Sequence, residues 1–240
     1  MIKHLTAQKA LKNSTVKQIE PLEVLNVAAA HDFNLLYVDR NIPLEQSVNS
    51  FFKRFFDLVA SALLLVGLFS WLFPLIAFLI KSDSKGPVFF FQKRNKKNGG
   101  LFICIKFRTM VVNDKADVLP AAENDSRITR VGAFLRRHHL DELPQLFNVL
   151  LGDMSMIGPR PYMVSDNEKY EKLIKNYLVR HRIKPGITGL AQVIDYVAPV
   201  TSIEYMERRV NKDVYYVYNW SPVLDAKIII RTLFKMVGVK

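Results

Sequence analysis

The 240-residue chain carries 34 basic and 22 acidic side chains, a formal net charge of +12, and half of its residues are hydrophobic. This length suits one domain with appendages, and this charge indicates an anionic partner: nucleic acid, an anionic membrane face or phosphorylated substrates. The single cysteine, Cys104, excludes an intramolecular disulfide and most cysteine-ligated metal sites.

Three regions follow one another along the chain. Residues 1–50 form an N-terminal extension without a clear domain signature, and their first twenty residues lack the apolar core of a secretory signal. Residues 51–81 are predicted to be a membrane helix, and residues 82–240 a domain at the membrane surface.

The membrane prediction rests on residues 58–80, which are 23 consecutive positions without a formal charge. That length is enough to cross a bilayer core. A buried core helix is disfavoured, because a wholly apolar helix this long needs a large protein around it. A spanning helix and a re-entrant helix, which dips into the membrane and returns to the same side, both remain open on composition.

Two features favour re-entry. Basic residues flank the segment at both ends, Lys53 and Arg54 before it and Lys81 and Lys85 after it, whereas a spanning helix concentrates positive charge on its cytoplasmic flank. Pro74 lies inside the segment and removes a helical hydrogen bond, which kinks or breaks a helix. Prolines also occur in spanning helices, so neither feature decides the question.

A β-hairpin is predicted after the membrane segment. Residues 88–92 and 101–107 favour strands and flank the turn-rich sequence NKKNGG. Cys104 alternates with other apolar residues in the second strand and is expected to be a buried structural thiol. Lys106 and Arg108 follow in the same alternation, so they are expected to share one face and to be able to hold a phosphate.

Apolar residues at three- and four-residue spacing predict helices in the remaining chain. They cover residues 126–152, 165–182, about 202–218 and a last helix capped by Ser221 with Pro222 at its first position. The stretch RITRVGAFLRRHHL is basic and amphipathic, which suits either an anionic membrane surface or the protein's own core. The last helix carries Lys227, Arg231 and Lys235 at four-residue spacing and is a second candidate for an interfacial helix.

Asp141 and Glu142 form an acidic pair within a basic region of the chain. If a helix starts at Asp141, that residue is its N-cap and Glu142 a solvated first-turn acid. Alternatively, one carboxylate attacks phosphorus and the other binds Mg²⁺. Spacing alone leaves both interpretations open. The sequence contains no P-loop, dinucleotide-binding glycine motif, HExxH motif or serine nucleophile elbow.

A series of motifs resembles one known family. KRFFDL, the apolar helix, GPVFFFQKR, KFRTM, DSRITRVGAFLRR, LDELPQLFNVLLGDMSMIGPRP and KPGITGLAQV occur in this order. Together they resemble the bacterial sugar transferases, the monotopic phosphoglycosyl transferases of bacteria, in the short form without a multi-spanning N-terminal region. The resemblance runs from about Lys53 to the C-terminus.

The resemblance implies a fold and an activity. It implies a mainly helical α+β protein, with a re-entrant helix-break-helix hairpin, interfacial amphipathic helices and a small β-hairpin around a cytoplasmic catalytic core at the bacterial inner membrane. It implies transfer of a sugar 1-phosphate from a UDP-sugar to undecaprenyl phosphate, which releases UMP and starts the assembly of a surface glycan. It implies membrane lipids and no nucleic acid as partners, and leaves room for a homodimer.

The resemblance also assigns roles to residues. Asp141 is expected to be the nucleophile of a covalent phosphosugar intermediate, and Glu142 to bind Mg²⁺ near the phosphates. Arg160 of GPRP is expected to contact a substrate phosphate, with Lys106 and Arg108 of KFRTM near the active site. The family breaks its membrane helix at a Ser-Pro pair, and this chain has Phe73 and Pro74 there.

Two other functions compete with this prediction. One is a membrane-anchored basic module that binds acidic lipids or nucleic acid, in which the acidic pair is only a helix cap. The other is an enzyme with a spanning helix and a soluble acceptor. The first predicts no release of UMP, and the second predicts that the ends of the membrane helix lie on opposite faces.

Overall fold

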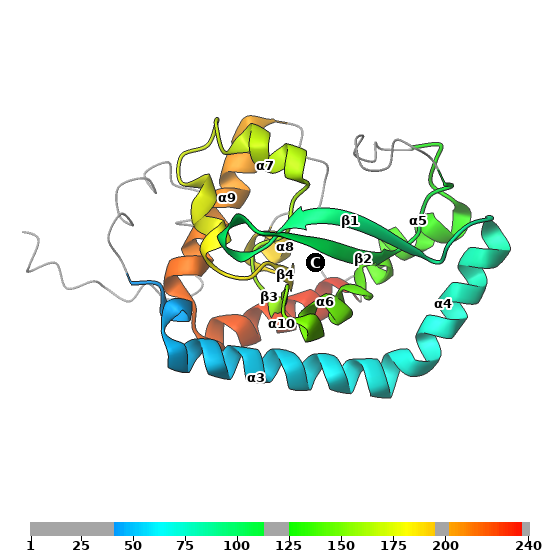
Figure 1. The fold of residues 1–240 in the computed structure, drawn as a ribbon, viewed down its shortest axis with the longest axis horizontal. Helices are drawn as coiled ribbons and strands as arrows, with labels where there is room; N and C mark the ends of the chain where they lie inside the picture. The colour runs from blue at the N-terminus through cyan, green and yellow to red at the C-terminus, as the bar shows by residue number, and fades with distance from the viewer. Residues whose placement is uncertain (1–40, 113–124, 195–201, 237–240) are drawn as a thin grey trace, which may run out of the picture.

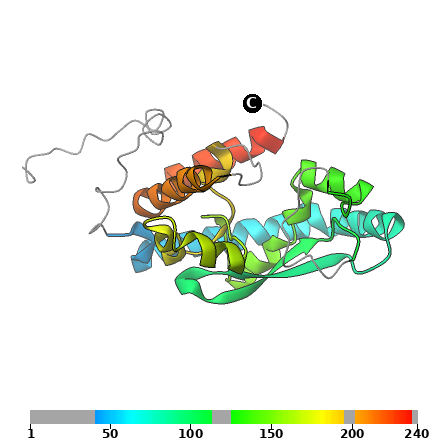
Figure 2. The ribbon, with the colours of Figure 1, turned by 90° about the horizontal axis from the view of Figure 1, so that it is seen from above.

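The computed structural model describes residues 41–112, 125–194 and 202–236, and in this part the chain is mainly helical with two small sheets (Figure 1). The predicted α+β class with a small β-hairpin is confirmed. Figure 2 shows two helices near the C-terminus, α9 (Ile203–Asn219) and α10 (Pro222–Met236), together on one side of the molecule and the hairpin on the other.

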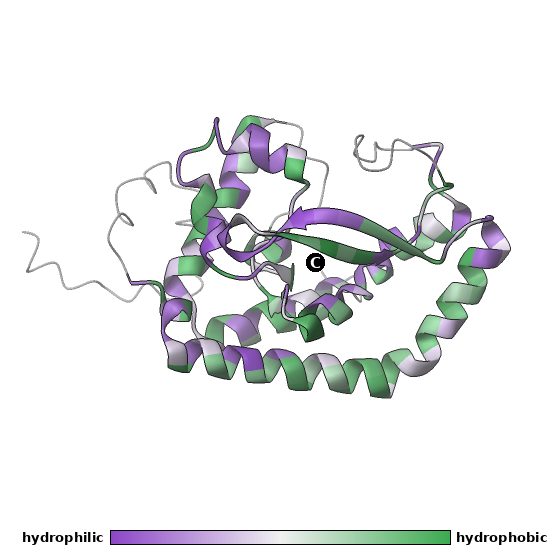
Figure 3. Cartoon of the chain, viewed as in Figure 1, coloured by the Kyte–Doolittle hydropathy of each residue, from purple (hydrophilic) through white to green (hydrophobic). Residues whose placement is uncertain are grey.

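One long helix runs along the molecule. It comprises α3 (Ser47–Leu63), a π-helical turn (Leu64–Leu68) and α4 (Phe69–Asp83), and it bends between α3 and α4 (Figure 1). Its 37 residues are long and apolar enough to cross a membrane, and only 17% of its most apolar stretch is buried within the protein. Figure 3 shows hydrophobic residues along most of both arms.

The bend falls at the π-helical turn and not at Pro74. Pro74 lies inside α4, six positions after the π-helical turn ends at Leu68, and the helix continues through it to Asp83. A π-helical turn widens the hydrogen-bond ladder and is a known cause of sharp helix bends. The structure therefore does not break this helix at Pro74, which corresponds to the Ser-Pro break of the family that the sequence resembles.

The first arm of the bent helix is attached to the domain by buried polar contacts. Lys53 Nζ lies 2.7 Å from Asp225 Oδ2 on α10, and both side chains are buried. The carboxylate of Asp57 accepts hydrogen bonds from Ser155 Oγ at 3.0 Å and from Met156 N at 2.9 Å. Asp57 therefore binds a segment of the domain almost one hundred residues later in the chain.

The second arm is attached to the same domain at its far end. Asp83 Oδ2 accepts a hydrogen bond from the Val131 amide at 2.8 Å, at the start of α5 (Arg130–Arg137). The guanidinium of Arg108 donates hydrogen bonds to three carbonyls just after α4, those of Ser84, Lys85 and Pro87. Between the two ends, Ile76 and Ile80 pack against Phe107 and Leu135.

The predicted β-hairpin is confirmed as β1 (Phe89–Asn95) and β2 (Leu101–Phe107), which pair in antiparallel orientation. The amide side chain of Asn148 accepts from Ile105 N at 3.0 Å and donates to Ile103 O at 2.7 Å. Asn148 therefore joins α6 (Gln145–Leu151) to the edge of β2. The thiol of Cys104 in β2 is buried, as predicted.

A second, parallel strand pair was not predicted from the sequence. It joins β3 (Ser155–Ile157) to β4 (Gly186–Thr188). The segments meet backbone to backbone, because a Cβ on Gly186 would lie 2.0 Å from the Gly158 amide nitrogen. Only glycine allows this approach, which explains the glycines of IGPR and KPGITG.

The predicted helix over residues 165–182 is wrong in its middle. The structure has α7 (Val164–Tyr170), a break, and a 3₁₀-helix (Tyr177–Arg182) that follows Asn176 in the left-handed conformation, at φ 62°. Tyr170 and Tyr177 on the two pieces both pack into one buried cluster with α9. The break therefore lets both pieces face α9, which a single straight helix does not achieve.

The last two helices agree with the sequence prediction. The α9 helix covers the predicted region 202–218, and the hydroxyl of Ser221 accepts a hydrogen bond from the Leu224 amide at 3.2 Å, as an N-cap does. Pro222 is the first residue of α10. The inner faces of both helices build the main core with β3, α8 (Leu190–Ile194) and the segment that precedes α3.

Candidate active site

The acidic pair lies in a tight turn between two helices. Residues Leu140–Glu142 form one 3₁₀ turn after α5, entered through His139 in the left-handed conformation at φ 56°. The prediction that Asp141 caps a helix is wrong, because α6 begins at Gln145 and makes no side-chain capping hydrogen bond. Asp141 and Glu142 are therefore available for roles other than capping.

Glu142 is buried and its two oxygens are bound by two cations. Lys106 Nζ lies 2.6 Å from Oε1, and Arg160 donates to both oxygens, from Nη2 at 2.6 Å and from Nη1 at 2.9 Å. Burial alone would raise the pKa of Glu142, but Arg160 and Lys106 together hold it well below its usual range. Glu142 is therefore an anion that holds two cations in place.

Asp141 is half-buried beside this cluster, and no hydrogen bond or ion pair engages its carboxylate within the described residues. Burial, and after it the negative charge of Glu142, raises the pKa of Asp141, while Lys106, Arg136 and Arg160 act in the opposite direction. The two neighbouring carboxylates thus differ: Glu142 accepts three hydrogen bonds from two cations, whereas Asp141 accepts none within the described residues and lies in a basic environment.

Two backbone arrangements place the cations. Lys106 lies on β2, the strand that Asn148 joins to α6, so the same contact brings Lys106 beside the turn that precedes α6. Arg160 follows β3 in the rigid Gly-Pro-Arg-Pro turn. Its carbonyl accepts a hydrogen bond from the buried guanidinium of Arg180, which pairs with Asp213 of α9 at 3.1 Å.

Arg108 does not join this cluster. It was predicted to share a phosphate with Lys106, because the two residues alternate in sequence. The strand ends at Phe107, and the Arg108 guanidinium turns to the carbonyls that follow α4. The structure therefore brings together Asp141, Glu142, Lys106 and Arg160, and leaves Arg108 as a residue that fixes the end of the long apolar helix.

Two arginines near the acidic pair were not singled out from the sequence. Arg136 acts electrostatically on Asp141 and donates from Nε to Thr109 Oγ1 at 2.8 Å. Arg94 on β1 acts electrostatically on Glu142 and Arg160, donates to Pro161 O at 3.1 Å, and has a buried Nε without a hydrogen-bond partner. The alternation of β1, which places Arg94 and Gln92 on one face, was the available sequence signal.

The expected Mg²⁺ can be tested against these residues. Within the described ranges, no group of three or more His, Cys, Asp or Glu side chains gathers to hold a metal ion. Asp141 and Glu142 do supply the hard oxygen donors that Mg²⁺ prefers, and Mg²⁺ in such sites is usually held by one or two carboxylates and substrate phosphates. The donor set therefore fits a metal ion that is held jointly with a phosphorylated substrate.

The fold and the site together define a mainly helical α+β protein. In the described residues it has one long apolar helix and a carboxylate pair among basic side chains. The comparisons give the family. The sequence model of the family described as "Bacterial sugar transferase" matches residues 48–239, so the chain belongs to the bacterial sugar transferase family.

Three curated relatives illustrate the similarity. A protein from Klebsiella pneumoniae, named UDP-glucose:undecaprenyl-phosphate glucose-1-phosphate transferase, is 42% identical over 97% of this chain and 52% of its own length. A protein of the same name from Caulobacter vibrioides is 43% identical over 80% of this chain and 72% of its own length. The exopolysaccharide production protein PSS of Rhizobium leguminosarum is 44% identical over 75% of this chain and 92% of its own length.

The matched lengths differ among the relatives. The chain spans about half of the Klebsiella protein, 52% of its length, and most of the Rhizobium protein. The part that the family model matches contains nearly all of the long apolar helix, both strand pairs and the acidic pair, because the match begins within α3 and continues past α10.

Proposed function

We propose that this chain transfers a sugar 1-phosphate from a UDP-sugar to undecaprenyl phosphate, with Asp141 as the nucleophile. The observation that carries the proposal is the division between the two carboxylates: Lys106 and Arg160 bind Glu142, while Asp141 has no partner within the described residues. An unengaged carboxylate beside cations suits attack on a phosphoryl group, whose charge those cations then stabilise.

The proposed chemistry has two steps. In the first, an Asp141 oxygen bonds to the phosphorus that carries the sugar, and the bond from that phosphorus to the bridging oxygen breaks, so UMP leaves. In the second, a phosphate oxygen of undecaprenyl phosphate attacks the same phosphorus, and the bond to Asp141 breaks. Lys106 and Arg160 neutralise the charge of the incoming diphosphate. Mg²⁺, held by the acidic pair with the substrate phosphates, would supply further charge neutralisation.

We further propose that the long helix is re-entrant and lies in the bacterial inner membrane, with the domain on the cytoplasmic face. Support comes from its two ends, since Lys53 and Asp57 near the start and Asp83 at the end all contact the same folded domain. A helix that crosses the membrane would place its ends on opposite faces, about 30 Å apart. A bent helix held at both ends by one domain has its ends on one face.

The sugar is proposed from the relatives. The Klebsiella and Caulobacter proteins are named for UDP-glucose and glucose 1-phosphate, and an Aeromonas hydrophila relative that is 40% identical is named for UDP-N-acetylgalactosamine. UDP-glucose is therefore our first candidate. The name of the Rhizobium relative places it in exopolysaccharide production, which is the pathway class proposed here.

The proposal is tested by incubating the purified full chain with undecaprenyl phosphate, Mg²⁺ and a panel of UDP-sugars, and by measuring UMP. We expect at most one equivalent of UMP per protein without the lipid acceptor and sustained UMP release with it, and we expect the release to stop when EDTA removes Mg²⁺. Binding of acidic vesicles without UMP release from any sugar nucleotide would instead support the membrane-anchored binding module. UMP release with a water-soluble acceptor would contradict the lipid acceptor.

Replacement of Arg160 is expected to impair the transfer strongly. Arg160 binds Glu142 through two nitrogens, and this fork can also bind a phosphate bidentately. We expect Arg160→Ala to lower kcat/KM by about 10²–10³, as loss of one charge-stabilising donor does. Arg160→Lys keeps the charge but not the fork and should recover only part of the activity. Equal activity of the lysine variant and the parent protein would show that charge alone is needed.

Replacement of Arg136 is expected to shift the pH dependence. The attacking carboxylate of Asp141 must be deprotonated, and Arg136 lowers its pKa while burial raises it. Without Arg136 the pKa of Asp141 rises further, so the acid limb of kcat/KM in Arg136→Gln should move to higher pH. Arg137→Gln, which removes an exposed neighbouring charge, is the control and should leave the limb in place. Superimposable profiles for all three proteins would contradict the role of Asp141.

Labelling of introduced cysteines tests re-entry. Ser47 and Lys85 are exposed and lie at the two ends of the bent helix, and the buried Cys104 gives a silent background. We expect Ser47→Cys and Lys85→Cys to react with a membrane-impermeant maleimide from the cytoplasmic side only. Reaction of the two positions from opposite sides would establish a spanning helix and refute the re-entrant one.

A further inference from the structure

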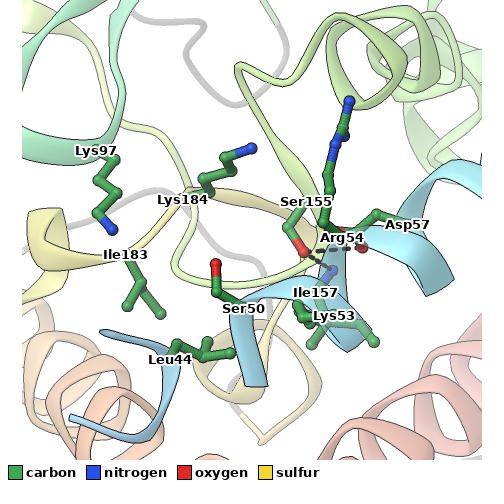
Figure 4. A pocket seen from close by; sticks show the side chains of 10 residues that line it. All are labelled: Leu44, Ser50, Lys53, Arg54, Asp57, Lys97, Ser155, Ile157, Ile183 and Lys184. Atoms are coloured by element: carbon green, nitrogen blue, oxygen red, sulfur yellow. Dashed lines mark hydrogen bonds between the residues drawn. The ribbon is translucent and has the colours of Figure 1, made fainter. Parts of the chain in front are cut away.

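A second cluster of basic side chains surrounds a small pocket away from the acidic pair. The pocket has a volume of about 60 Å³, and Arg54, Lys97 and Lys184 line it together with Ser50. We call these four residues the basic pocket. Figure 4 shows Lys184 between Lys97 and Arg54, with the hydroxyl of Ser50 below Lys184. None of the four belongs to the candidate active site.

Positive charge in the basic pocket exceeds the nearby negative charge: Asp57 in the pocket lining and the neighbouring Asp153 act electrostatically on Lys184, but the three cations of the basic pocket outnumber them. Two further lining residues have partners of their own. Lys53 pairs with Asp225, and the carboxylate of Asp57 accepts hydrogen bonds from Ser155 and Met156. The nearby Asp153 pairs with Lys96 at 2.6 Å. Lys97 and Lys184 have no hydrogen bond or ion pair within the described part of the chain.

Two of the cations are held close together. A Cβ on Gly152 would lie 3.5 Å from Arg54 Nη2 and 3.7 Å from Lys184 Nζ, so both charged groups crowd the same glycine. Arg54 is fixed there because it donates to the carbonyls of Val149 and Leu150 at the end of α6. Burial, followed by the charge of Arg54, lowers the pKa of Lys184. The two positive charges repel each other, and a bound anion would relieve this repulsion.

We infer that the basic pocket binds one phosphate group. A volume of 60 Å³ corresponds to about two water molecules at liquid density, on the order of a single phosphate. A phosphate presents several acceptor oxygens in a tetrahedral arrangement and can meet a guanidinium, two ammonium groups and a hydroxyl at once. A planar carboxylate has two oxygens and satisfies fewer of these donors.

The phosphate has two possible sources that share this chemistry. The basic pocket lies beside α3, whose outer face exposes Phe51 and Phe55, so a phospholipid headgroup is within reach if this face meets the membrane. A soluble phosphate or nucleotide can also enter from the solvent. The inference does not depend on the proposed transfer reaction, because Asp141 does not line the basic pocket. The variant Asp141→Asn should therefore bind the phosphate as the parent protein does.

Site-resolved lysine acetylation followed by mass spectrometry tests the inference on the full chain. Maltoside micelles with chloride or with inorganic phosphate at equal ionic strength form one pair of arms. Vesicles of a neutral galactolipid with or without phosphatidylglycerol form the other. We expect acetylation of Lys97 and Lys184 to fall together, by about tenfold at nine-tenths occupancy, in the arm that contains the true phosphate source. Labelling of the exposed Lys172 should not change.

The comparison of the four arms identifies the source of the bound phosphate and shows which results overturn the inference. Protection by inorganic phosphate in micelles assigns a soluble phosphate, and protection only by phosphatidylglycerol assigns a lipid headgroup. Equal labelling in the chloride and phosphate arms together with equal labelling in both kinds of vesicle overturns the inference. Protection that is the same in neutral and anionic vesicles means that the membrane merely covers the lysines, and it overturns the inference as well.

Variants test whether the lysines share one anion. In the protecting arm, Lys184→Gln should raise the phosphate or phosphatidylglycerol concentration that half-protects Lys97 by about tenfold, because one charge-assisted hydrogen bond is lost. Lys97→Gln, in the exposed hairpin turn, should do the same for Lys184. Lys172→Gln removes an equal charge elsewhere and should change neither value. Independent protection of Lys97 and Lys184 would rule out a shared site.

Discussion

Asp141→Asn is expected to abolish turnover while the protein still folds and binds membranes. The amide keeps the size of the side chain but cannot form the bond to phosphorus, and removal of a nucleophile typically lowers kcat by at least about three orders of magnitude. Stability should change little, because no partner within the described residues depends on this carboxylate. The measurement is UMP release, together with thermal unfolding and vesicle flotation.

A matched control separates the nucleophile from general charge effects. Asp153→Asn removes one carboxylate from a partly exposed ion pair with Lys96 and should keep most of the activity. With radiolabelled sugar nucleotide and no acceptor, the parent protein should retain label on Asp141 and the Asn variant none. Full turnover by Asp141→Asn would refute the assignment, and turnover without a labelled protein would refute the covalent intermediate alone.

Lys53→Met is expected to destabilise the protein by about 3–5 kcal/mol, because it leaves Asp225 as a buried charge without its cation. The remaining donors to Asp225 are the hydroxyl of Tyr216 at 2.7 Å and the indole of Trp220 at 3.0 Å, which are both neutral. The free energy of unfolding can be measured by denaturant titration in maltoside micelles.

Two further variants interpret that result. Lys53→Met combined with Asp225→Asn removes both charges and keeps one acceptor oxygen, which the Trp220 indole can use while the Tyr216 hydroxyl donates to the Ile157 carbonyl at 3.2 Å. The double variant should therefore recover much of the lost stability. Arg182→Met breaks the exposed pair with Glu45 and should cost no more than about 1 kcal/mol. If Lys53→Met is as stable as Arg182→Met, the buried pair does not hold the long apolar helix to the domain.

The long apolar helix and most other elements could be predicted from local sequence. Apolar length predicted the long helix, alternation predicted β1 and β2, and Ser221 with Pro222 predicted the start of α10. These signals are local because helix capping, strand alternation and turn chemistry depend on neighbours in the chain. The parallel pair of β3 and β4 joins three-residue strands about thirty positions apart, and so short a pattern carries no such signal.

The candidate site was predictable only in part. Motif order identified Asp141, Glu142, Lys106 and Arg160, and the structure brings these four together. Sequence also suggested that Lys106 and Arg108 act together, but strand alternation gives a common face only while the strand continues, and β2 ends between them. The direction of the Arg108 side chain is set instead by three unpaired carbonyls after α4, which no local pattern reveals.

The sequence by itself determined a basic, mainly helical chain with one membrane-compatible helix and a carboxylate pair among cations, because composition and periodicity are properties of the chain. Only the tertiary structure decided how the two carboxylates differ. Glu142 receives Lys106 from a strand 36 residues before it and Arg160 from a turn 18 residues after it, whereas Asp141 receives neither. Adjacent residues in a tight turn point in different directions, so their environments are set by packing between distant segments.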